Sequence, residues 1–364
     1  MIRAVLVDDE PPARVRMRQL LDAAGGVSIV GEAGSAEEAR EVIRQSRPDL
    51  VFLDVEMPEV RGTALAASLP EPRPFIVFAT AYDNYGLDAI AVDATDYLLK
   101  PVSRAKLAVT LDRVRARLAK LNVERDVAAA TQVQSHLWPG SLPRIPGFDC
   151  AAASLPARGV GGDFYDLFSI GGSRWALLIG DASGKGVAAG LVASAVQARV
   201  NTASRMAHLA PEELMAAVNR DVYATTDGAR YATAIYGELD AATSELKLVI
   251  AGHYPAVIIG DTVQQWCATG GALGLMEHQA FETRQLSLPP GSMLIAYTDG
   301  VTDAQNEAGE EYPEDDLLAL LERNRDRSAA DICATVLDTI RAYRGSRQDQ
   351  DDVTVMVVKH DTRS

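Results

Sequence analysis

The sequence has few cysteines and histidines, and several common catalytic motifs are missing from its 364 residues. The cysteines Cys150, Cys267 and Cys333 stand far apart without a CxxC spacing, which argues against a thiolate metal site and fits a reducing compartment. The five histidines show no metal-ligand spacing. A Cys-x5-Arg motif and a G-x4-GK[ST] loop are both absent, so cysteine-based phosphoester hydrolysis and P-loop nucleotide hydrolysis are unsupported.

Long apolar runs and an excess of positive charge are also absent. No run reaches eighteen apolar residues, and the chain starts with a strand-like segment in place of a signal peptide, so we expect a cytoplasmic protein without membrane contact. A net charge of −15 gains no counterion-release energy from nucleic acid, which disfavours a DNA-binding output. Only the segment 104–136 is basic.

Residues 1–103 alternate between apolar runs and helical patterns. Short runs that are apolar on both faces, separated by amphipathic stretches, are typical of a doubly wound α/β domain with a five-stranded parallel sheet. In such a sheet the functional crevice lies outside the carboxyl ends of the strands. The expected strands are 4–7, 27–31, 50–53, 75–79 and 96–99, and the expected helices are 11–24, 35–46, 63–69 and 83–91.

A long helix is predicted for residues 104–138. Leucine and valine recur there at a 4-3-4-3 spacing, which is typical of a coiled-coil seam, so we expect a dimerising linker and a homodimer. The alternative is an amphipathic helix that packs on its own domain. Pro139 and Gly140 then end the helix. The seam consists of Leu107, Leu111, Val114, Leu118 and Leu121.

Residues 145–360 show a different pattern, in which strands follow one another and helices come in pairs. This order predicts a layered α+β domain and argues against a second parallel sheet. The expected strands are 175–180, 231–238, 246–251, 256–259, 293–298 and 353–358, and the expected helices are 186–205, 211–225, 314–325 and 328–343.

Polar side chains follow four of the strands expected in residues 1–103, so they should face one crevice. Carboxylates crowded there would repel one another unless a hard cation such as Mg²⁺ were bound. Asp54 is the candidate nucleophile for a phosphoryl group, and Lys100 and Thr80 are candidate contacts for the phosphate oxygens. The complete set is Asp8, Asp9, Asp54, Thr80 and Lys100.

Four groups of aspartates and glycines border strands of residues 145–360. Each alone is a weak signal, because Asp-Gly marks ordinary turns and paired glycines permit a bulge. Together the aspartates would carry a charge of about −4, which two divalent cations would balance. Paired metal ions activate a water and clamp phosphate oxygens, so such a site requires no protein nucleophile. The groups are Gly161-Gly162-Asp163, Asp181, Asp299-Gly300 and Asp351-Asp352.

The first domain contains the segments VLVDDEPPAR, LVFLDVEMP, FIVFATAYDNYGLDAI and DYLLKPVS. With them it resembles the receiver domain of two-component response regulators. The resemblance implies that a sensor histidine kinase phosphorylates Asp54 and that the Lys100–Pro101 bond is cis. It also implies Mg²⁺ ligands at Asp8, Asp9, Asp54 and the Glu56 carbonyl, and switch residues at Thr80, Tyr97 and Lys100.

The last domain contains AATQVQSHLWPGSLPRIPGFD, SLPARGVGGDFYDLF, LLIGDASGKGVAAGLVAS, RYATAIYGELD, AGHYPAVII, GALGL, LIAYTDGVTDA and DDVTVMVV. It resembles the RsbU and SpoIIE group of PPM-type serine/threonine phosphatases, which implies an αββα sandwich with two Mn²⁺ or Mg²⁺ ions. Asp181 would bridge the ions. The other implied metal residues are Asp163, Gly162 and the Ala182 carbonyl on one side, and Asp299 and Asp351 on the other, with Asp352 as the alternative to Asp351.

Some residues near these motifs have two readings. Arg158 could grip the substrate phosphate or form a surface salt bridge. Asp303 could assist a third metal or close a turn, and His253 could be structural. Lys185 stands where many relatives carry histidine, which leaves metal binding intact but could alter substrate or regulatory contacts.

We therefore expect a response regulator in which phosphorylated Asp54 controls a metal-dependent serine/threonine phosphatase. The resemblance implies a substrate of the STAS-domain type, a phosphorylated anti-sigma-factor antagonist of a stress response. The alternative is a catalytically weak adaptor that binds a sigma factor or an anti-sigma partner. The sequence does not say whether phosphorylation activates or inhibits.

Overall fold

The computed structural model describes residues 1–81, 94–139, 141–156, 159–206, 209–226, 228–347 and 351–362. They divide into two compact units, Met1–Arg125 and Asp126–Ser364. None of the helices in the described ranges combines the length and the apolar composition that crossing a membrane requires.

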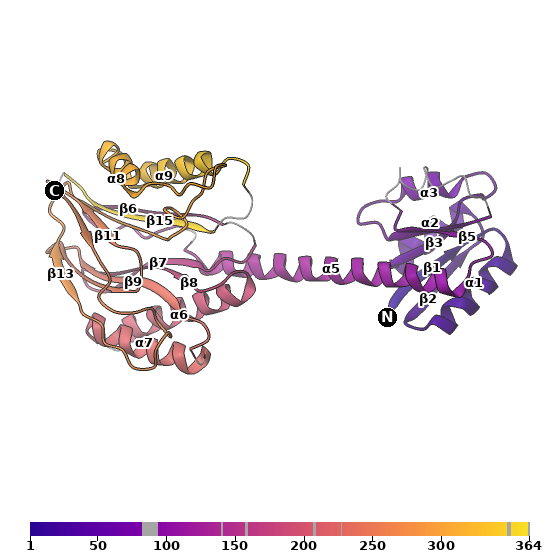
Figure 1. Cartoon of the computed structure of the whole chain (residues 1–364), viewed down its shortest axis with the longest axis horizontal. Helices are drawn as coiled ribbons and strands as arrows, with labels where there is room; N and C mark the ends of the chain where they lie inside the picture. The colour runs from indigo at the N-terminus through magenta and orange to yellow at the C-terminus, as the bar shows by residue number, and fades with distance from the viewer. Residues whose placement is uncertain are drawn as a thin grey trace. The chain divides into compact units, whose positions relative to one another are not determined.

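The first unit contains one five-stranded sheet in which all paired strands are parallel, with the order β2-β1-β3-β4-β5 (Figure 1). This confirms the predicted doubly wound architecture. Apolar clusters cover both faces of the sheet, which is why the strands read as continuous apolar runs. The strands are β1 (Ile2–Val7), β2 (Val27–Ala33), β3 (Leu50–Asp54), β4 (Phe75–Thr80) and β5 (Asp96–Leu99).

Three helices in the described part of this unit lie between the strands, and local chemistry explains their starts. Pro11 opens the first helix, where its missing N–H costs nothing. The Ser35 side chain caps the second helix by accepting from the backbone N–H of Glu38 at 3.2 Å. The helix expected at 83–91 falls outside the described residues. The helices are α1 (Pro11–Ala24), α2 (Ala36–Ser46) and α3 (Gly62–Ser68).

Helix α5 (Arg104–Leu137) carries the predicted heptad seam, but most of that seam is used within the first unit. Leu107, Leu111 and Val114 are fully buried in the apolar cluster of the receiver-like sheet, and Leu118 packs against the same cluster. The alternative reading, a helix packed on its own domain, accounts for these positions. Leu121 is 39% exposed, so the dimer stays a prediction that depends on Leu121 and later positions of the helix.

The second unit is a sandwich of two five-stranded antiparallel sheets, with α6 and α7 against one sheet and α8 and α9 against the other (Figure 1). It is the predicted αββα arrangement. The helices are α6 (Val187–Met206), α7 (Pro211–Thr226), α8 (Glu314–Arg323) and α9 (Ala329–Arg344).

The two sheets draw their strands from the whole length of the unit. One has the order β13 (Arg284–Ser287), β10 (Glu245–Ala251), β9 (Ala232–Asp240), β8 (Arg174–Ala182) and β7 (Asp163–Gly171). The other has the order β12 (Val263–Trp266), β11 (Ala256–Ile259), β14 (Met293–Tyr297), β15 (Val353–His360) and β6 (Phe148–Leu155).

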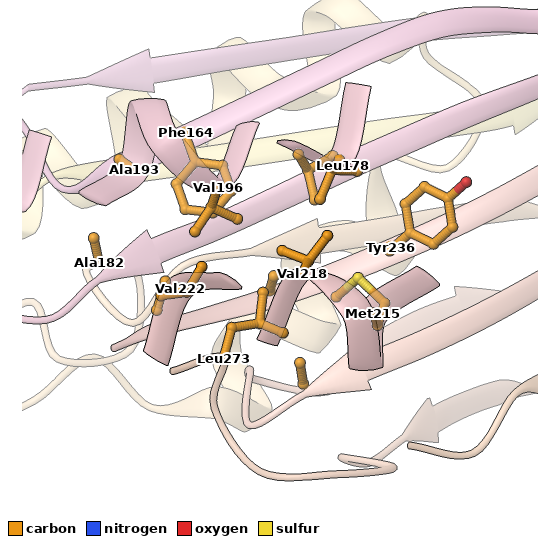
Figure 2. Packing of buried hydrophobic residues seen from close by; sticks show 14 of the residues in the cluster. Phe164, Leu178, Ala182, Ala193, Val196, Met215, Val218, Val222, Tyr236 and Leu273 are labelled. Carbon is orange, nitrogen blue, oxygen red and sulfur yellow. The ribbon is translucent and has the colours of Figure 1, made fainter. Parts of the chain in front are cut away.

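Alternate residues of one strand serve different apolar layers. In β8, Leu177 and Ile179 belong to the layer between the sheets, whereas Leu178 faces the helices. Figure 2 shows the helix-facing layer, in which Leu178 and Tyr236 of the sheet lie near Val196, Met215 and other side chains of α6 and α7. Burial on both faces positions the strand ends rigidly, and the candidate site residues lie at those ends.

Four strands of the second unit were not among the expected ones: β6, β7, β12 and β13. Strand β6 reads FDCAAASL, and alanine has a low intrinsic preference for strands. Its full-length antiparallel pairing with β15 supplies what the local sequence lacks. Pairing with a strand far away in the sequence therefore determines that residues 148–155 form a strand.

Candidate functional site

The first carboxylate cluster lies at the carboxyl edge of the parallel sheet. Asp8 and Asp9 follow β1, and Asp54 ends β3, the strand paired with β1. One carboxylate oxygen from each of the three lies within 4.8 Å of the others. Asp8 and Asp54 are each only 7% exposed. Crowded, nearly buried carboxylates with oxygens converging on one point fit a hard divalent cation such as Mg²⁺.

Lys100 supplies one positive charge to this cluster. Its Nζ lies 2.7 Å from Asp8 Oδ2 and 2.6 Å from Asp54 Oδ2. Burial raises the pKa of Asp54, and the bond from Lys100 opposes part of that rise. Burial alone would lower the pKa of Lys100, but its bonds to Asp54 and Asp8 outweigh that effect and raise it. One lysine beside three carboxylates leaves a net charge of −2, which a divalent cation would balance.

The other residues predicted for the receiver site lie at the carboxyl edge of the sheet or near that edge. Thr80 is fully buried at the end of β4, and its carbonyl accepts from the Lys100 N–H at 2.7 Å. The Glu56 N–H donates to Asp54 Oδ1 at 3.2 Å. Tyr97 on β5 is half-buried and packs against one of the two apolar clusters of the sheet. The Lys100–Pro101 peptide bond is cis, as expected.

The second cluster begins with two aspartates on neighbouring strands. Asp163 at the start of β7 stands directly opposite Asp181 near the end of β8 in the antiparallel register. Asp163 is 2% exposed, and its Oδ2 accepts the hydroxyls of Thr298 at 2.8 Å and Thr354 at 2.6 Å. Thr354 lies on β15 of the opposite sheet, and Thr298 directly follows β14 of that sheet. Asp163 therefore ties the two sheets together beside Asp181.

The glycine turn before β7 fits against these carboxylates. The Gly162 N–H donates to Asp352 Oδ2 at 2.9 Å, and the Gly162 carbonyl accepts from the Ala182 N–H at 3.1 Å. A Cβ at Gly162 would stand 2.7 Å from Asp181 Oδ1, and one at Gly161 would stand 2.3 Å from Asp352 Oδ2. Only glycine allows the backbone to approach the carboxylates this closely.

Asp299 and the Asp351-Asp352 pair complete the second cluster. A Cβ at Gly300 would lie 1.8 Å from the Asp352 carbonyl oxygen, so the Asp299-Gly300 turn packs directly on the acidic pair. The two members of the pair differ. Asp352 is buried and held by Gly162, whereas Asp351 is half-exposed and forms an ion pair with Lys185 Nζ at 3.0 Å.

The aspartates of the second cluster raise one another's pKa. Burial is the largest cause for Asp163, Asp181 and Asp299, and neighbouring carboxylates add to it. Burial raises the pKa of Asp299 to about 6, and among the neighbouring charges Asp351 contributes most to that rise. Within the described ranges, only Asp8, Asp9 and Asp54 form a set of three side chains whose ligand atoms all lie within 4.8 Å of one another. The wider second cluster suits two cations better than one, because paired ions stand about 3.5–4 Å apart.

Arg344 is a basic residue of this site that the sequence reasoning missed. It ends α9, is 7% exposed, and donates from Nη2 to the Gly300 carbonyl at 2.9 Å. Burial lowers its pKa, and Asp351, Asp352 and Asp163 counteract that change. Its Nε has no hydrogen-bond partner among the described residues. Arginine is common in the last turn of a helix, so no local feature of the sequence marks Arg344 as a residue of this site.

The remaining predicted residues have less central positions or fall outside the described ranges. Arg158 is among the residues that the structure does not describe. The Asp303 N–H donates to the Asp299 carbonyl at 2.8 Å, and its Oδ1 accepts from Tyr254 at 3.1 Å, which are the contacts of a turn residue. His253 is buried, its Nδ1 lies 2.8 Å from Thr233 Oγ1, and burial lowers its pKa to about 4.

Two family models match the chain. The Stage II sporulation protein E (SpoIIE) model matches residues 171–361, and the response regulator receiver domain model matches residues 4–112. Transcriptional regulatory protein BtsR of Escherichia coli strain K12 is 44% identical over 124 residues, 34% of this chain and 52% of BtsR. An uncharacterized response regulatory protein of Yersinia pestis is 46% identical over 127 residues, 34% of this chain and 53% of that protein. The chain spans about half the length of these curated relatives.

Solved structures resemble the second unit. The RsbU and RsbW domains of a Mycobacterium tuberculosis protein match with a TM-score of 0.54 and 26% identity, over 63% of this chain and 64% of that one. The SiaA-PP2C domain of Pseudomonas aeruginosa matches in fold, with a TM-score of 0.59 and 18% identity over 67% of this chain and 99% of that one. The PP2C phosphatase domain and regulatory fragment of Bacillus subtilis SpoIIE match in fold, with a TM-score of 0.51 and 21% identity, over 60% and 64%.

The two folds and the two family models define a receiver domain joined to a domain with the fold of the SpoIIE-type phosphatases. The SpoIIE model covers more than half of the sequence, and the chain belongs to the SpoIIE family.

Proposed function

We propose that this chain is a response regulator in which phosphorylation of Asp54 controls a protein serine/threonine phosphatase. The observation that carries the proposal is the presence, in one chain, of two separate buried carboxylate clusters, each suited to divalent cations and phosphate. The first would receive a phosphoryl group and the second would remove one from another protein.

In the receiver, the Asp54 carboxylate would attack the phosphorus of a phosphohistidine on a sensor histidine kinase and form an acyl phosphate, while the P–N bond breaks and the kinase imidazole leaves and takes up a proton. Mg²⁺ held by Asp8, Asp9 and Asp54 would neutralise charge on the transferred group. Lys100 Nζ now lies 2.6 Å from Asp54 Oδ2, so a small movement would let it pair with a phosphoryl oxygen. The buried Thr80 hydroxyl at the neighbouring strand end is a further hydrogen-bond donor for the same group.

In the phosphatase, the metal residues we propose are the Gly162-Asp163 turn, Asp181 with the Ala182 carbonyl, and Asp299 with Asp351. Mn²⁺ or Mg²⁺ ions bound there would activate a water and offset phosphate charge. In this proposal Asp352 holds the Gly162 turn and is not one of the metal residues. Its side chain is buried, and its Oδ2 already accepts a hydrogen bond from the Gly162 N–H. Lys185 pairs with half-exposed Asp351 at the surface, where it could meet a phosphate.

The substrate we propose is a phosphoserine or phosphothreonine on a STAS-domain anti-sigma-factor antagonist. Support comes from family membership and from the likeness, at 26% identity, to a protein with RsbU and RsbW domains. A homodimer through the later part of α5 belongs to the same proposal, because Val123, Val133 and Leu137 are exposed there.

Turnover assays on the full chain would test the proposal. With Mn²⁺, purified protein should release phosphate from a generic phosphoester and from a phosphorylated STAS-domain protein. A small-molecule phosphodonor should change that rate, and Asp54→Asn should abolish the change while leaving the basal rate intact. An unaltered donor response in Asp54→Asn would contradict control through Asp54.

The second candidate function is a phosphorylation-dependent adaptor with little turnover. It requires a degenerate metal site, whereas all the acidic residues of the second cluster are present, and Asp163 and Asp352 are buried. Metal-dependent turnover of a generic phosphoester would exclude the adaptor. Absence of turnover together with tight binding of a sigma factor or anti-sigma partner would favour it.

A further inference from the structure

The last turns of α5 reach the glycine turn of the second cluster through one buried glutamine. Gln134 is 7% exposed, although Gln132 and Ser135 beside it are exposed. Its Nε2 donates to the Gly161 carbonyl at 2.7 Å, and its Oε1 accepts from the Gly161 N–H at 3.0 Å. One side-chain amide therefore satisfies both backbone groups of Gly161, as a neighbouring strand would.

Helix α6 packs closely around this contact. A Cβ at Gly190 would stand 2.2 Å from a methyl group of Val160 and 3.2 Å from both Gln134 Nε2 and the Gly161 oxygen. From the same helix, Gln197 Nε2 donates to the Leu137 carbonyl at 3.1 Å. The Gln134 side chain is thus enclosed between α5, α6 and the glycine turn, and it cannot leave without displacing one of them.

The glycine turn in turn touches the carboxylates of the cluster. Gly162, the next residue, donates to Asp352 Oδ2 at 2.9 Å and accepts from Ala182 at 3.1 Å, beside Asp181. Two consecutive glycines have more backbone freedom than any other pair, so the turn requires outside contacts to hold one conformation. Gln134 supplies two such contacts on the Gly161 side.

We propose that Gln134 is a positioning residue of the phosphatase metal site. Its amide holds the Gly161-Gly162 turn in the conformation in which Gly162 and Asp181 can bind a divalent cation together. The inference rests on the proposed metal-dependent function of this cluster. A glutamine that only satisfied two backbone groups would affect stability, and the metal affinity of the folded protein would not depend on it.

The test is direct Mn²⁺ binding to full-length protein in which Asp9→Asn and Asp54→Asn remove the receiver cation site from every variant, and it is measured from the electron paramagnetic resonance signal of free Mn²⁺. Gln134→Met keeps the side-chain length and volume but loses both hydrogen bonds. We expect its Mn²⁺ dissociation constant to rise by about tenfold, as the loss of about 1.4 kcal/mol would produce. The matched control Gln132→Met changes the same residue type on the exposed face of α5 and should bind as the wild type does.

Steady-state kinetics give a second readout. Gln134→Met should need a higher Mn²⁺ concentration for half-maximal activity and recover most of its kcat at saturating Mn²⁺. Should Gln134→Met fail to fold, Gln134→Asn is the milder variant, because it keeps the amide but falls one methylene short of Gly161. The same weakening of Mn²⁺ binding is expected for it.

The outcomes distinguish a failure of the proposed phosphatase function from a failure of the positioning role of Gln134. Wild-type protein that binds no Mn²⁺ at this cluster contradicts the proposed phosphatase function, and the role of Gln134 with it. Wild type that binds Mn²⁺, with folded Gln134 variants of equal affinity, overturns the positioning role alone. A Gln132→Met variant that weakens binding as much as Gln134→Met would also overturn it, because the effect would then belong to the helix as a whole.

Discussion

The two carboxylate clusters handle their negative charge in different ways. In the receiver, Lys100 lies within 2.7 Å of both Asp8 and Asp54 and offsets part of their repulsion. In the phosphatase unit, the basic residues beside the cluster stand at its edges: Lys185 pairs with half-exposed Asp351, and Arg344 binds the Gly300 carbonyl.

This difference has a physical consequence. Lys100 can stabilise the receiver cluster and then respond when a phosphoryl group arrives, so the metal-free receiver is a tolerable state. The phosphatase cluster instead raises the pKa values of Asp163, Asp181 and Asp299, mainly through burial. We infer that its folded form depends more strongly on divalent cations, or on protons in their place.

The largest effect is expected at Asp181. Asp181→Asn should lower metal-dependent turnover by roughly 10³-fold, because the residue faces Asp163 and every other carboxylate of the cluster contributes to its pKa. The metal-free protein should stay folded or become more stable, since one buried like charge is removed. Phosphate release and circular dichroism check both parts, with Asp261→Asn on an exposed loop as the control. Full activity in Asp181→Asn would contradict the metal site.

Removing Lys100 should leave the negative charge of the receiver cluster without its compensating cation. Lys100→Met leaves Asp8 and Asp54 buried without their cation, which should cost about 2 kcal/mol in the free energy of unfolding of the receiver, below the full buried-pair value because Lys100 is partly exposed. Saturating Mg²⁺ should restore part of the loss. Denaturant unfolding with and without Mg²⁺ measures this, and Lys106→Met provides the exposed-lysine control. A loss that Mg²⁺ does not reduce would argue against a shared cation site.

Removing Arg344 should make the phosphatase unit more dependent on metal. Arg344→Met leaves the Gly300 carbonyl without its donor and removes a positive charge near Asp351 and Asp352, which should cost about 1–2 kcal/mol in metal-free protein. The rise in Tm on adding Mn²⁺ should therefore exceed that of the wild type. Arg341→Met, which changes an exposed arginine on the same helix, should change little. If Mn²⁺ raised the Tm of both variants equally, Arg344 would have no part in the metal site.

The raised pKa values also predict a pH dependence of opposite sign with and without metal. A folded-state pKa above the usual aspartate value of about 4 means that the native state binds more protons, so metal-free stability should fall as pH rises through that range. Cations must displace those protons. Mn²⁺ affinity should therefore increase by about tenfold between pH 5 and pH 7, the range centred on the pKa of about 6 for Asp299. Titration calorimetry at several pH values checks this, and a flat profile would contradict protonated aspartates.

The smallest effect is expected on the exposed side of α5. Leu121→Ala should change the free energy of unfolding by less than about 0.5 kcal/mol, because Leu121 is 39% exposed. Val114→Ala should destabilise the receiver by about 1–2 kcal/mol, because Val114 is fully buried in it. Sedimentation equilibrium would show whether Leu121→Ala alters self-association. Identical masses for wild type and variant would leave that residue without a part in a dimer.

Local sequence was sufficient for the receiver, and the reason is the regularity of its pattern. Four of its five strands are short apolar runs that end at or just before a functional side chain, so the positions of Asp8, Asp54, Thr80 and Lys100 along the chain already implied one edge of one sheet. Local sequence was less sufficient for the second unit. Strand β6 is rich in alanine and forms by pairing with β15, a segment about two hundred residues away.

The heptad spacing of α5 illustrates a real ambiguity in sequence reasoning. A seam spaced 4-3-4-3 buries one face of a helix whether the partner is a second copy or the helix's own domain. Leu107, Leu111 and Val114 bury that face in the receiver. Only packing partners distinguish the two cases, and the sequence does not name them.

The sequence by itself determined the two domain types and the residues able to bind cations and phosphate, because these depend on local patterns and on side-chain chemistry. The tertiary structure alone decided which polar partners those residues have. It placed Thr298 and Thr354 on Asp163, Gly162 on Asp352, Arg344 on Gly300 and Gln134 on Gly161. These contacts join segments separated by 27 to 191 positions, and hydrogen bonds over such separations follow from how sheets and helices pack.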